Sequence, residues 1–248
     1  MSDATENLLV DLGNSRVKWA TSSIDDWSEG QPFENNGTQT DFTVWRDLKP
    51  ANIYVSNSAG DSCYQHLCDW CSGIWNLFPQ TLEAQIEQAG IKNGYRDPNQ
   101  LGVDRWLAMV AARQIYPSAF VVVDCGTAIT VDSVSENGQF LGGVISVGSQ
   151  TMISALKAKA PHLSSGTMNY SGVLNLDTQN AIDSGALIFV AGGIERVLKE
   201  VESSLDSGFP VVMTGGSAPA IAPLIDGPVD IRPDLVLRGI QVVIETGF

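Results

Sequence analysis

Histidine and basic side chains are scarce in this chain of 248 residues. It holds two histidines and 14 lysines and arginines against 28 acidic residues, which gives a formal net charge of −14. Nucleic-acid binding draws its affinity from clustered basic residues, and no such cluster is present, so we expect no nucleic-acid partner. His66 lies in a cysteine-containing segment and His162 in a loop flanked by proline. A hydrolase triad is therefore unsupported.

Long apolar runs are missing as well. No window approaches the ~18 uninterrupted apolar residues of a membrane span, and the first residues, MSDATENLLVDLG, lack the basic and apolar regions of a signal peptide. We therefore expect a cytoplasmic protein without a membrane partner. With 44% apolar residues, 24 glycines and 11 prolines, the composition is that of a globular protein and excludes collagen-like or disordered chains.

Cysteine occurs four times, at Cys63, Cys68, Cys71 and Cys125. The first three lie close to His66, and all four residues of that segment are of types that bind zinc. On a helix, however, ~100° per residue spreads them over more than half of the circumference. Cys68 and Cys71 fall in an apolar stripe, so we interpret these thiols as core residues.

Two segments of the chain look like copies of one another, residues 7–20 and residues 120–134. In each, an apolar run ends in Asp-x-Gly and a small polar residue, and a second strand-like run follows. Both segments therefore predict a β-hairpin, and their likeness indicates an internal duplication. The second copy continues into a third strand at residues 140–145.

The other elements follow from periodicity. Residues 102–112 and 178–201 have apolar side chains at helical spacing, and the strand at residues 210–213 leads into the turn at residues 214–217. A boundary near Pro117 divides the chain, which predicts an α/β protein with domains at residues 1–117 and 118–248.

Both Asp-x-Gly turns are candidate phosphate sites. Glycine permits a turn whose N–H groups approach a phosphate, and a carboxylate at a strand end can hold Mg²⁺, as Asp11 would with Lys18 nearby. The second copy places Asp124 and Thr127 in the same way. A plain hairpin would suit one copy, but two copies favour a nucleotide site. Gly215 and Gly216 would also let a nucleoside approach the backbone closely. The alternative is that they only form a strand-to-helix turn.

The segment Gly102-Val103-Asp104-Arg105 combines a carboxylate base with a guanidinium in one helical turn. Phosphoryl transfer to an alcohol uses a base for the hydroxyl proton and a fixed cation for an anionic group of the substrates. The simpler interpretation is an aspartate that stabilises the helix dipole and an arginine in a surface ion pair.

Seven segments, taken in chain order, resemble the motif set of the type III pantothenate kinases. They are DLGNSRVKWA at 11–20, YRDPNQLGVDRW at 95–106, VVVDCGTAITVD at 121–132, LGGVISVG at 141–148, DTQNAIDSG at 177–185, TGG at 214–216 and PDLVLRGI at 233–240. The family belongs to the actin, sugar kinase and Hsp70 superfamily. The resemblance therefore implies two duplicated ribonuclease-H-like domains with a nucleotide cleft between them, an actin-like ATPase fold.

The function that this resemblance implies is the ATP-dependent phosphorylation of pantothenate to 4′-phosphopantothenate, the first step of coenzyme A biosynthesis. The family requires Mg²⁺ and a monovalent cation, K⁺ or NH₄⁺, and acts as a homodimer with composite active sites. Two alternatives remain. One is a non-catalytic regulatory accessory factor of the same family, and the other is a superfamily kinase for another small alcohol.

Residue by residue, the resemblance implies a set of binding roles. The ATP-binding positions are Asp11, Gly13, Asn14, Ser15, Lys18, Thr127, Gly215 and Gly216, and the pantothenate positions are Tyr95, Gly102, Val103, Asp104, Arg105 and Thr178. Asp104 is the proton acceptor, Asp11 faces Mg²⁺, and Asp124 binds the monovalent cation. Thr178 is the threonine that the partner subunit supplies.

Three positions depart from the family pattern. Ser15 stands where threonine is usual and keeps the hydroxyl. Val147 replaces a proline near the substrate, and Ser217 replaces an aspartate near the nucleoside end. The aspartate and arginine of the catalytic motif are intact.

Overall fold

Two compact units make up the protein in a computed structural model that describes residues 6–23, 26–163, 168–205 and 208–247. Unit 1 comprises Met1–Arg113 and Asp234–Phe248, and unit 2 comprises Gln114–Pro233. The chain thus leaves unit 1 once and returns to it for its last helix.

Unit 1 is built on a six-stranded sheet with the strand order β3-β2-β1-β5-β6, in which β4 also pairs with β2. The strands are β1 (Asn7–Leu12), β2 (Arg16–Ser22), β3 (Trp27–Glu29), β4 (Phe33–Glu34), β5 (Asn52–Asn57) and β6 (Gln80–Thr81). β1 and β2 form the first predicted hairpin, and β5 runs parallel to β1. A short ribbon, β7 (Glu87–Gln88) and β8 (Ile91–Lys92), lies outside this sheet.

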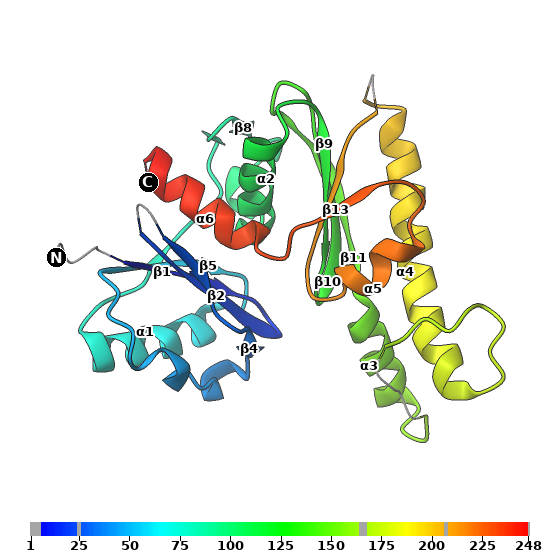
Figure 1. The fold of residues 1–248 in the computed structure, drawn as a ribbon, viewed down its shortest axis with the longest axis horizontal. Coiled ribbons are helices and arrows are strands. Elements are labelled where there is room, and N and C mark those ends of the chain that lie inside the picture. The colour runs from blue at the N-terminus through cyan, green and yellow to red at the C-terminus, as the bar shows by residue number, and fades with distance from the viewer. Residues whose placement is uncertain (1–5, 24–25, 164–167, 206–207, 248) are drawn as a thin grey trace. The chain divides into compact units, whose positions relative to one another are not determined.

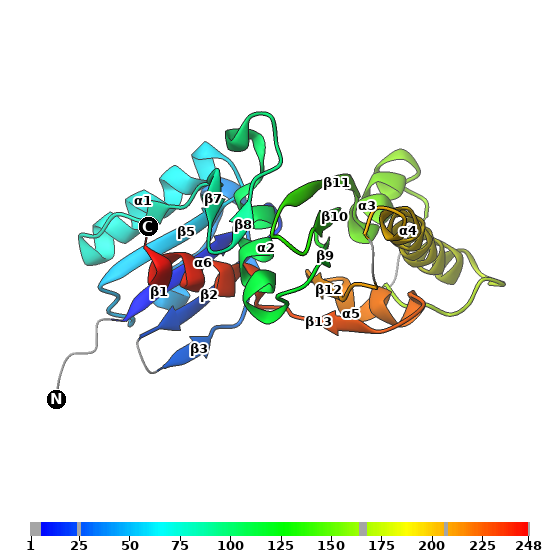
Figure 2. The ribbon, with the colours of Figure 1, turned by 90° about the horizontal axis from the view of Figure 1, so that it is seen from above.

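Helix α1 (Asp61–Trp75) covers one face of this sheet, and α6 (Leu235–Thr246) covers the other (Figures 1 and 2). Side chains alternate between the faces of a strand. Leu8, Val10 and Leu12 therefore enter the core with α1. Leu9 and Asp11 point to the opposite face, and both are buried.

Unit 2 repeats this plan with a five-stranded sheet of order β11-β10-β9-β12-β13. The strands are β9 (Phe120–Cys125), β10 (Ala128–Val134), β11 (Phe140–Val147), β12 (Val211–Thr214) and β13 (Val229–Ile231). The three-stranded meander predicted from sequence is confirmed, because β10 pairs antiparallel with both β9 and β11. β12 then runs parallel to β9, as β5 does to β1. The two sheets thus share strand order and direction, which is the repeat that the sequence predicts.

The helices of unit 2 are α3 (Ser149–Lys159), α4 (Thr178–Glu202) and the short α5 (Ala218–Ile221). Val121, Val123 and Cys125 of β9 face α4 in the core of the unit. By alternation, Asp124 points to the other face of the sheet. The predicted helix at residues 178–201 is a single helix.

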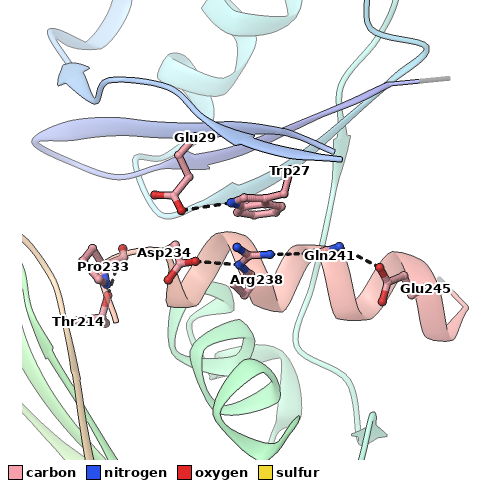
Figure 3. A network of polar contacts seen from close by, with 8 residues as sticks. All are labelled: Trp27, Glu29, Thr214, Pro233, Asp234, Arg238, Gln241 and Glu245. Carbon is pink, nitrogen blue, oxygen red and sulfur yellow. Dashed lines mark hydrogen bonds and ion pairs between the residues drawn. The ribbon is translucent and has the colours of Figure 1, made fainter. Parts of the chain in front are cut away.

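Helix α6 marks the difference between the predicted and the observed division of the chain. The sequence places residues 118–248 in one domain, whereas residues 234–248 belong to unit 1. Figure 3 shows how α6 is anchored there. Arg238 donates to Asp234 (Nε to Oδ2, 2.8 Å), and its guanidinium lies 3.6 Å from the ring centroid of Trp27 in β3. The first contact lies within the α6 segment, and the second joins α6 to the first sheet, where the helix also packs on β1, β2 and β5.

The sequence predicts Cys68 and Cys71 as core thiols; this is confirmed for Cys71, whereas Cys68 is only half-buried. Cys63 and Cys71 are buried with Leu67 in the core of unit 1, and all four cysteines are free thiols. Burial raises the pKa of Cys71 to about 12, and the neighbouring Cys68 adds to this shift. In the described part of the chain, no three His, Cys, Asp or Glu side chains are grouped so as to hold a metal ion.

Candidate active site

Asp11 and Lys18 face one another across the first hairpin. They are Cα partners in the register of β1 and β2, and Asp11 Oδ2 lies 3.6 Å from Lys18 Nζ. Asp11 is 6% exposed. Burial raises the pKa of Asp11; the positive charge of Lys18 opposes this shift, and the Asp104 carboxylate adds to it. The predicted pair is therefore present, and a third charged group acts on it.

The turn between β1 and β2 carries the other predicted phosphate-binding residues. The N–H of Gly13 donates to the Arg16 carbonyl at 3.1 Å, which closes the turn. Asn14 and Ser15 are exposed at its tip. Asn14 Nδ2 donates to the Ser58 carbonyl at 2.9 Å, just beyond β5. The turn is thus fixed at its base and tied to a neighbouring strand.

Helix α2 (Val103–Ile115) presents the catalytic motif in its first turn. The Asp104 carboxylate accepts a hydrogen bond from the N–H of Arg105 (Oδ1, 2.8 Å). A Cβ on Gly102 would lie 2.8 Å from the same oxygen, so glycine leaves the space that this carboxylate orientation needs. Val103 is half-buried. A carboxylate in the first turn also interacts favourably with the helix dipole, as the simpler interpretation held.

Arg105 is more buried than a surface ion pair would require, with 7% of its surface exposed. Its Nη1 donates to the Tyr95 hydroxyl at 2.8 Å, and the guanidinium lies 5.7 Å from the centroid of the Tyr95 ring. The segment that carries Tyr95 is held by Asn93, whose Oδ1 accepts from the Tyr95 N–H at 3.0 Å. The structure thus brings together two predicted pantothenate residues from different segments.

Asp104 and Asp11 belong to the same region of unit 1, since the charge of Asp104 raises the pKa of Asp11. The charged groups of this region come from three elements: Asp11 from β1, Lys18 from β2, and Asp104 with Arg105 from α2. Tyr95 joins them from the loop before α2. Such a set can accept a proton, hold a cation and bind an anion.

Unit 2 contributes the second Asp-x-Gly turn. The N–H of Gly126 donates to the Ala128 carbonyl at 3.1 Å, and Thr127 is exposed at the tip. Gly215, with φ +90°, lies against this turn: a Cβ there would be 2.4 Å from Asp124 Oδ1. Gly216 is exposed next to it. The predicted residues Asp124, Thr127, Gly215 and Gly216 thus lie at one end of the second sheet.

Two threonines beside Asp124 were not predicted from sequence. Thr130 in β10 and Thr214 in β12 are the Cα partners of Asp124 on either side, so the three side chains share a face of the sheet. Thr130 Oγ1 is buried, with no hydrogen-bond partner among the described residues. Only strand register brings these positions together, and no local sequence pattern indicates it.

Thr178 is the first residue of α4. The helix is capped by Asp177, whose Oδ1 accepts from the Asn180 N–H at 2.9 Å. Thr178 itself is exposed. Of the positions that depart from the family pattern, Val147 is exposed at the end of β11, and Ser217 is buried with its N–H donating to the Cys125 carbonyl.

The donor atoms fit the ions that the resemblance implies. Mg²⁺ is commonly held by one or two carboxylates together with substrate phosphates, and the buried Asp11 carboxylate is a ligand of this kind. A monovalent cation takes oxygen ligands, and the Asp124 carboxylate with the buried Thr130 hydroxyl beside it provides such oxygens.

The solved structures that resemble this chain define its fold class. A conserved protein from Campylobacter jejuni, described as a Baf family transcriptional activator, superposes with a TM-score of 0.58 at 23% identity and covers 96% of this chain and 97% of its own. The activator of 2-hydroxyisocaproyl-CoA dehydratase from Clostridium difficile, with bound ADPNP, gives 0.57 at 13% identity and covers 97% and 95%. The fold is that of the actin-like ATPases and sugar kinases.

Sequence comparison narrows this class to one family. The family profile of the type III pantothenate kinases matches residues 7–200. The type III pantothenate kinase of Nitrosococcus oceani is 36% identical over 252 residues, covering 95% of this chain and 92% of that protein. This chain therefore belongs to the type III pantothenate kinase family, and the resemblance found in the sequence is confirmed.

Proposed function

We propose that this protein transfers the γ-phosphoryl group of ATP to the primary hydroxyl of pantothenate, the opening step of coenzyme A biosynthesis. Family membership supports this proposal. The observation that carries it is the grouping of the Asp104 carboxylate, the Arg105–Tyr95 pair and the Asp11–Lys18 pair within unit 1. A base, an anion-binding guanidinium and a phosphate-binding turn are the parts that phosphoryl transfer to an alcohol requires.

Asp104 accepts the hydroxyl proton of pantothenate as the oxygen attacks phosphorus. Its Oδ1 is held by the Arg105 N–H, which orients the carboxylate and leaves Oδ2 for the substrate. The Arg105 guanidinium, oriented by the Tyr95 hydroxyl, binds the carboxylate of pantothenate. Gly102 and Val103 complete this substrate segment. General-base catalysis of this kind typically contributes ~10²–10⁴-fold.

In this proposal the ATP phosphates bind at the Gly13–Ser15 turn, with Lys18 as the cation. Thr127 also contacts ATP, and Gly215 and Gly216 contact its nucleoside. Asp11 holds Mg²⁺ with the phosphates. When bound, Mg²⁺ neutralises charge that develops on the phosphoryl oxygens. Asn14 and Ser15 are exposed at the tip of the turn, where a phosphate can reach their N–H groups.

Asp124 binds a monovalent cation, K⁺ or NH₄⁺, in the same proposal. The buried Thr130 oxygen supports this role, because a bound cation would satisfy it. We expect activity to rise with K⁺ or NH₄⁺ and to respond less to Na⁺, and Asp124→Asn to lose this dependence. Full wild-type activity in a buffer with Na⁺ as the sole monovalent cation would contradict the assignment.

A homodimer completes the site, with Thr178 contributed to the neighbouring subunit. Two features of unit 2 support this. Large apolar side chains are exposed on β11, on the segment before α4 and on α4: Leu141, Val144, Ile145, Val147, Val173, Leu174, Leu176 and Phe189. Gly185, Gly192 and Gly193 of α4 have nothing within 4 Å of a Cβ position, so another helix could approach closely there. Exposed apolar side chains of this kind are common at protein interfaces.

The cytoplasm is the compartment in which we place this enzyme, since coenzyme A synthesis draws on cytoplasmic ATP. Across the helices that the structure describes, none combines the length and apolar character needed to span a membrane.

An ATP-consumption assay over a panel of small alcohols tests the proposal and its alternatives. We expect turnover with pantothenate alone among pantothenate, simple sugars and glycerol. Turnover with another alcohol would identify a different kinase of the superfamily, and no turnover with any acceptor would point to a regulatory protein. The likeness to a Baf family transcriptional activator concerns the fold alone.

A further inference from the structure

Asn35, which directly follows β4, binds the phosphate-binding turn at two points. Its Nδ2 donates to the Gly13 carbonyl at 2.6 Å, and its backbone N–H donates to the Ser15 carbonyl at 3.0 Å. β4 places it there, because Arg16 and Glu34 are partners in the register of β2 and β4. One residue thus holds the carbonyls of the Gly13–Asn14 and Ser15–Arg16 peptides, which lie on either side of the Asn14–Ser15 peptide.

Because the peptide group is planar, the hydrogen bond from Asn35 to the Gly13 carbonyl also fixes the direction of the Asn14 N–H. In a trans peptide the C=O and the following N–H point in opposite directions. When the Gly13 carbonyl is turned toward Asn35, the N–H of Asn14 must point away from it. Asn14 is exposed at the tip of the turn, so that N–H faces the side from which a phosphate can approach.

The orientation of the Asn35 amide is itself determined by its neighbours. Oδ1 lies 3.0 Å from the Gly37 N–H, 2.7 Å from the Thr40 hydroxyl and 3.3 Å from the Cys63 thiol. All three groups can donate a hydrogen bond, so this atom is the carbonyl oxygen and the other is the NH₂ group. The Asn35 donor is therefore fixed on the Gly13 carbonyl.

Helix α1 contacts Asn35 and Thr40 through the side chains of Cys63 and His66. His66 Nε2 lies 2.9 Å from the Thr40 carbonyl and must carry a proton there, because a carbonyl only accepts. Thr40 is 4% exposed, and Cys63 is buried. Cys63 and His66 are of residue types that bind zinc. In the structure they instead hold Asn35 and Thr40, which support the turn.

We propose that Asn35 is a positioning residue for nucleotide binding, which holds the Gly13–Ser15 turn in the conformation that presents the Asn14 N–H to the phosphates of ATP. Thr40, with Cys63 and His66 behind it, fixes the Asn35 side chain. This inference rests on the proposed function in one respect, the use of the turn for ATP phosphates.

Calorimetric titration with ATP, ADP and adenosine tests the proposal in Asn35→Ala. Alanine keeps the backbone bond to Ser15 but loses the Nδ2 bond to the Gly13 carbonyl. This loss predicts an affinity for ATP and ADP about 10-fold lower, with adenosine affinity unchanged. A merely structural defect would weaken all three ligands alike. Asn36→Ala is the matched control, because Asn36 is the exposed neighbour on the same loop.

A second pair of variants covers the case in which Asn35→Ala does not fold. Thr40→Val removes the hydroxyl that faces Asn35, while Thr40→Ser keeps it. We expect the loss of ATP affinity in Thr40→Val and its recovery in Thr40→Ser. In hydrogen exchange without nucleotide, peptides covering residues 13–16 should also exchange faster in Thr40→Val.

Wild-type ATP affinity in both Asn35→Ala and Thr40→Val would overturn the inference. Equal losses for ATP and adenosine would overturn it as well. The readout is nucleotide affinity and not turnover. A wild-type protein that binds ATP but does not phosphorylate pantothenate would therefore refute the proposed function, while the affinity pattern of the variants would still decide this inference.

Discussion

Burial of the Asp11 carboxylate is unfavourable, and the Mg²⁺-binding role that we propose for Asp11 explains why a charge is kept there. Asp11 is a nearly buried carboxylate, and burial raises its pKa despite Lys18 nearby. Burying a carboxylate without full compensation destabilises the ionised form. A residue that only stabilised the hairpin would not need a charge at this position. A site that holds Mg²⁺ beside phosphates does need it.

Asp11→Asn should therefore stabilise the fold in a pH-dependent way. In the wild type, the folded carboxyl binds its proton more tightly than the unfolded one. The free energy of unfolding then falls as the pH rises from the ordinary carboxyl pKa to the raised value, and stays lower above it. The asparagine variant lacks this loss, so its advantage should grow across that window and then level off.

Urea unfolding of both proteins between about pH 3 and pH 8 measures this difference. A constant difference over that range would show that the Asp11 pKa is not raised in the folded protein. Activity should be strongly reduced in the same variant, which separates the functional role of the charge from its effect on stability.

Part of the site could be predicted at the level of single residues. Asp11, Asp104 and Asp124 stand in local motifs, at strand ends or in the first turn of a helix, and a sequence displays such motifs directly. Asn35 and Thr130 could not be found in this way. Their roles depend on strand register and on a loop that returns to a distant turn, and neither is encoded in a short pattern.

Secondary-structure elements are also predicted where a local sequence pattern defines them, and not where contacts between distant segments do. The hairpins, the meander and helices α2 and α4 follow from turn residues and periodicity. The segment PDLVLRGI resembles a motif of the family, but its sequence does not indicate which sheet α6 covers. Gly239 in α6 gives the physical reason for its place: a Cβ there would lie 2.1 Å from the Leu107 carbonyl oxygen of α2. The two helices pack backbone to backbone.

Gly239→Ala should therefore destabilise the protein by about 1–3 kcal/mol, because the methyl group meets a main-chain oxygen rather than a flexible side chain. Turnover should fall too, since α2 carries Asp104 in its first turn. Gly73→Ala is the matched control. Gly73 is an exposed glycine in α1 with nothing within 4 Å of its Cβ position, so alanine should stabilise by about 0.5–1 kcal/mol.

Thermal or urea unfolding measures both variants. Equal effects of Gly239→Ala and Gly73→Ala would contradict the close contact of α6 with α2. Loss of stability in Gly239→Ala with full turnover would show that α2 keeps its first turn in place without this contact.

In our proposal, each active site of the whole molecule combines Asp104 of one subunit with Thr178 of the other, so it forms only in the dimer. Mixing Asp104→Asn with Thr178→Ala tests this. In a heterodimer, one site combines both defects and the other combines both intact residues. Random subunit exchange should then restore about a quarter of wild-type activity, because half of the dimers are mixed and each has one intact site.

Neither parent variant should show that activity when assayed alone. A monomer in light scattering at the assay concentration would contradict the dimer. If the subunits are shown to exchange but the mixture gains no activity, the proposed role of Thr178 is contradicted.

Phosphorus NMR of the reaction with pantothenate, ATP, Mg²⁺ and K⁺ is the most direct test of the central claim. The wild type should form one new phosphate monoester, on the primary hydroxyl of pantothenate. Asp104→Asn keeps the oxygen that accepts from the Arg105 N–H, so it should fold and bind ATP normally while turnover falls ~10²–10⁴-fold. A wild type that forms no such ester, or an Asp104→Asn variant as fast as the wild type, would contradict the account.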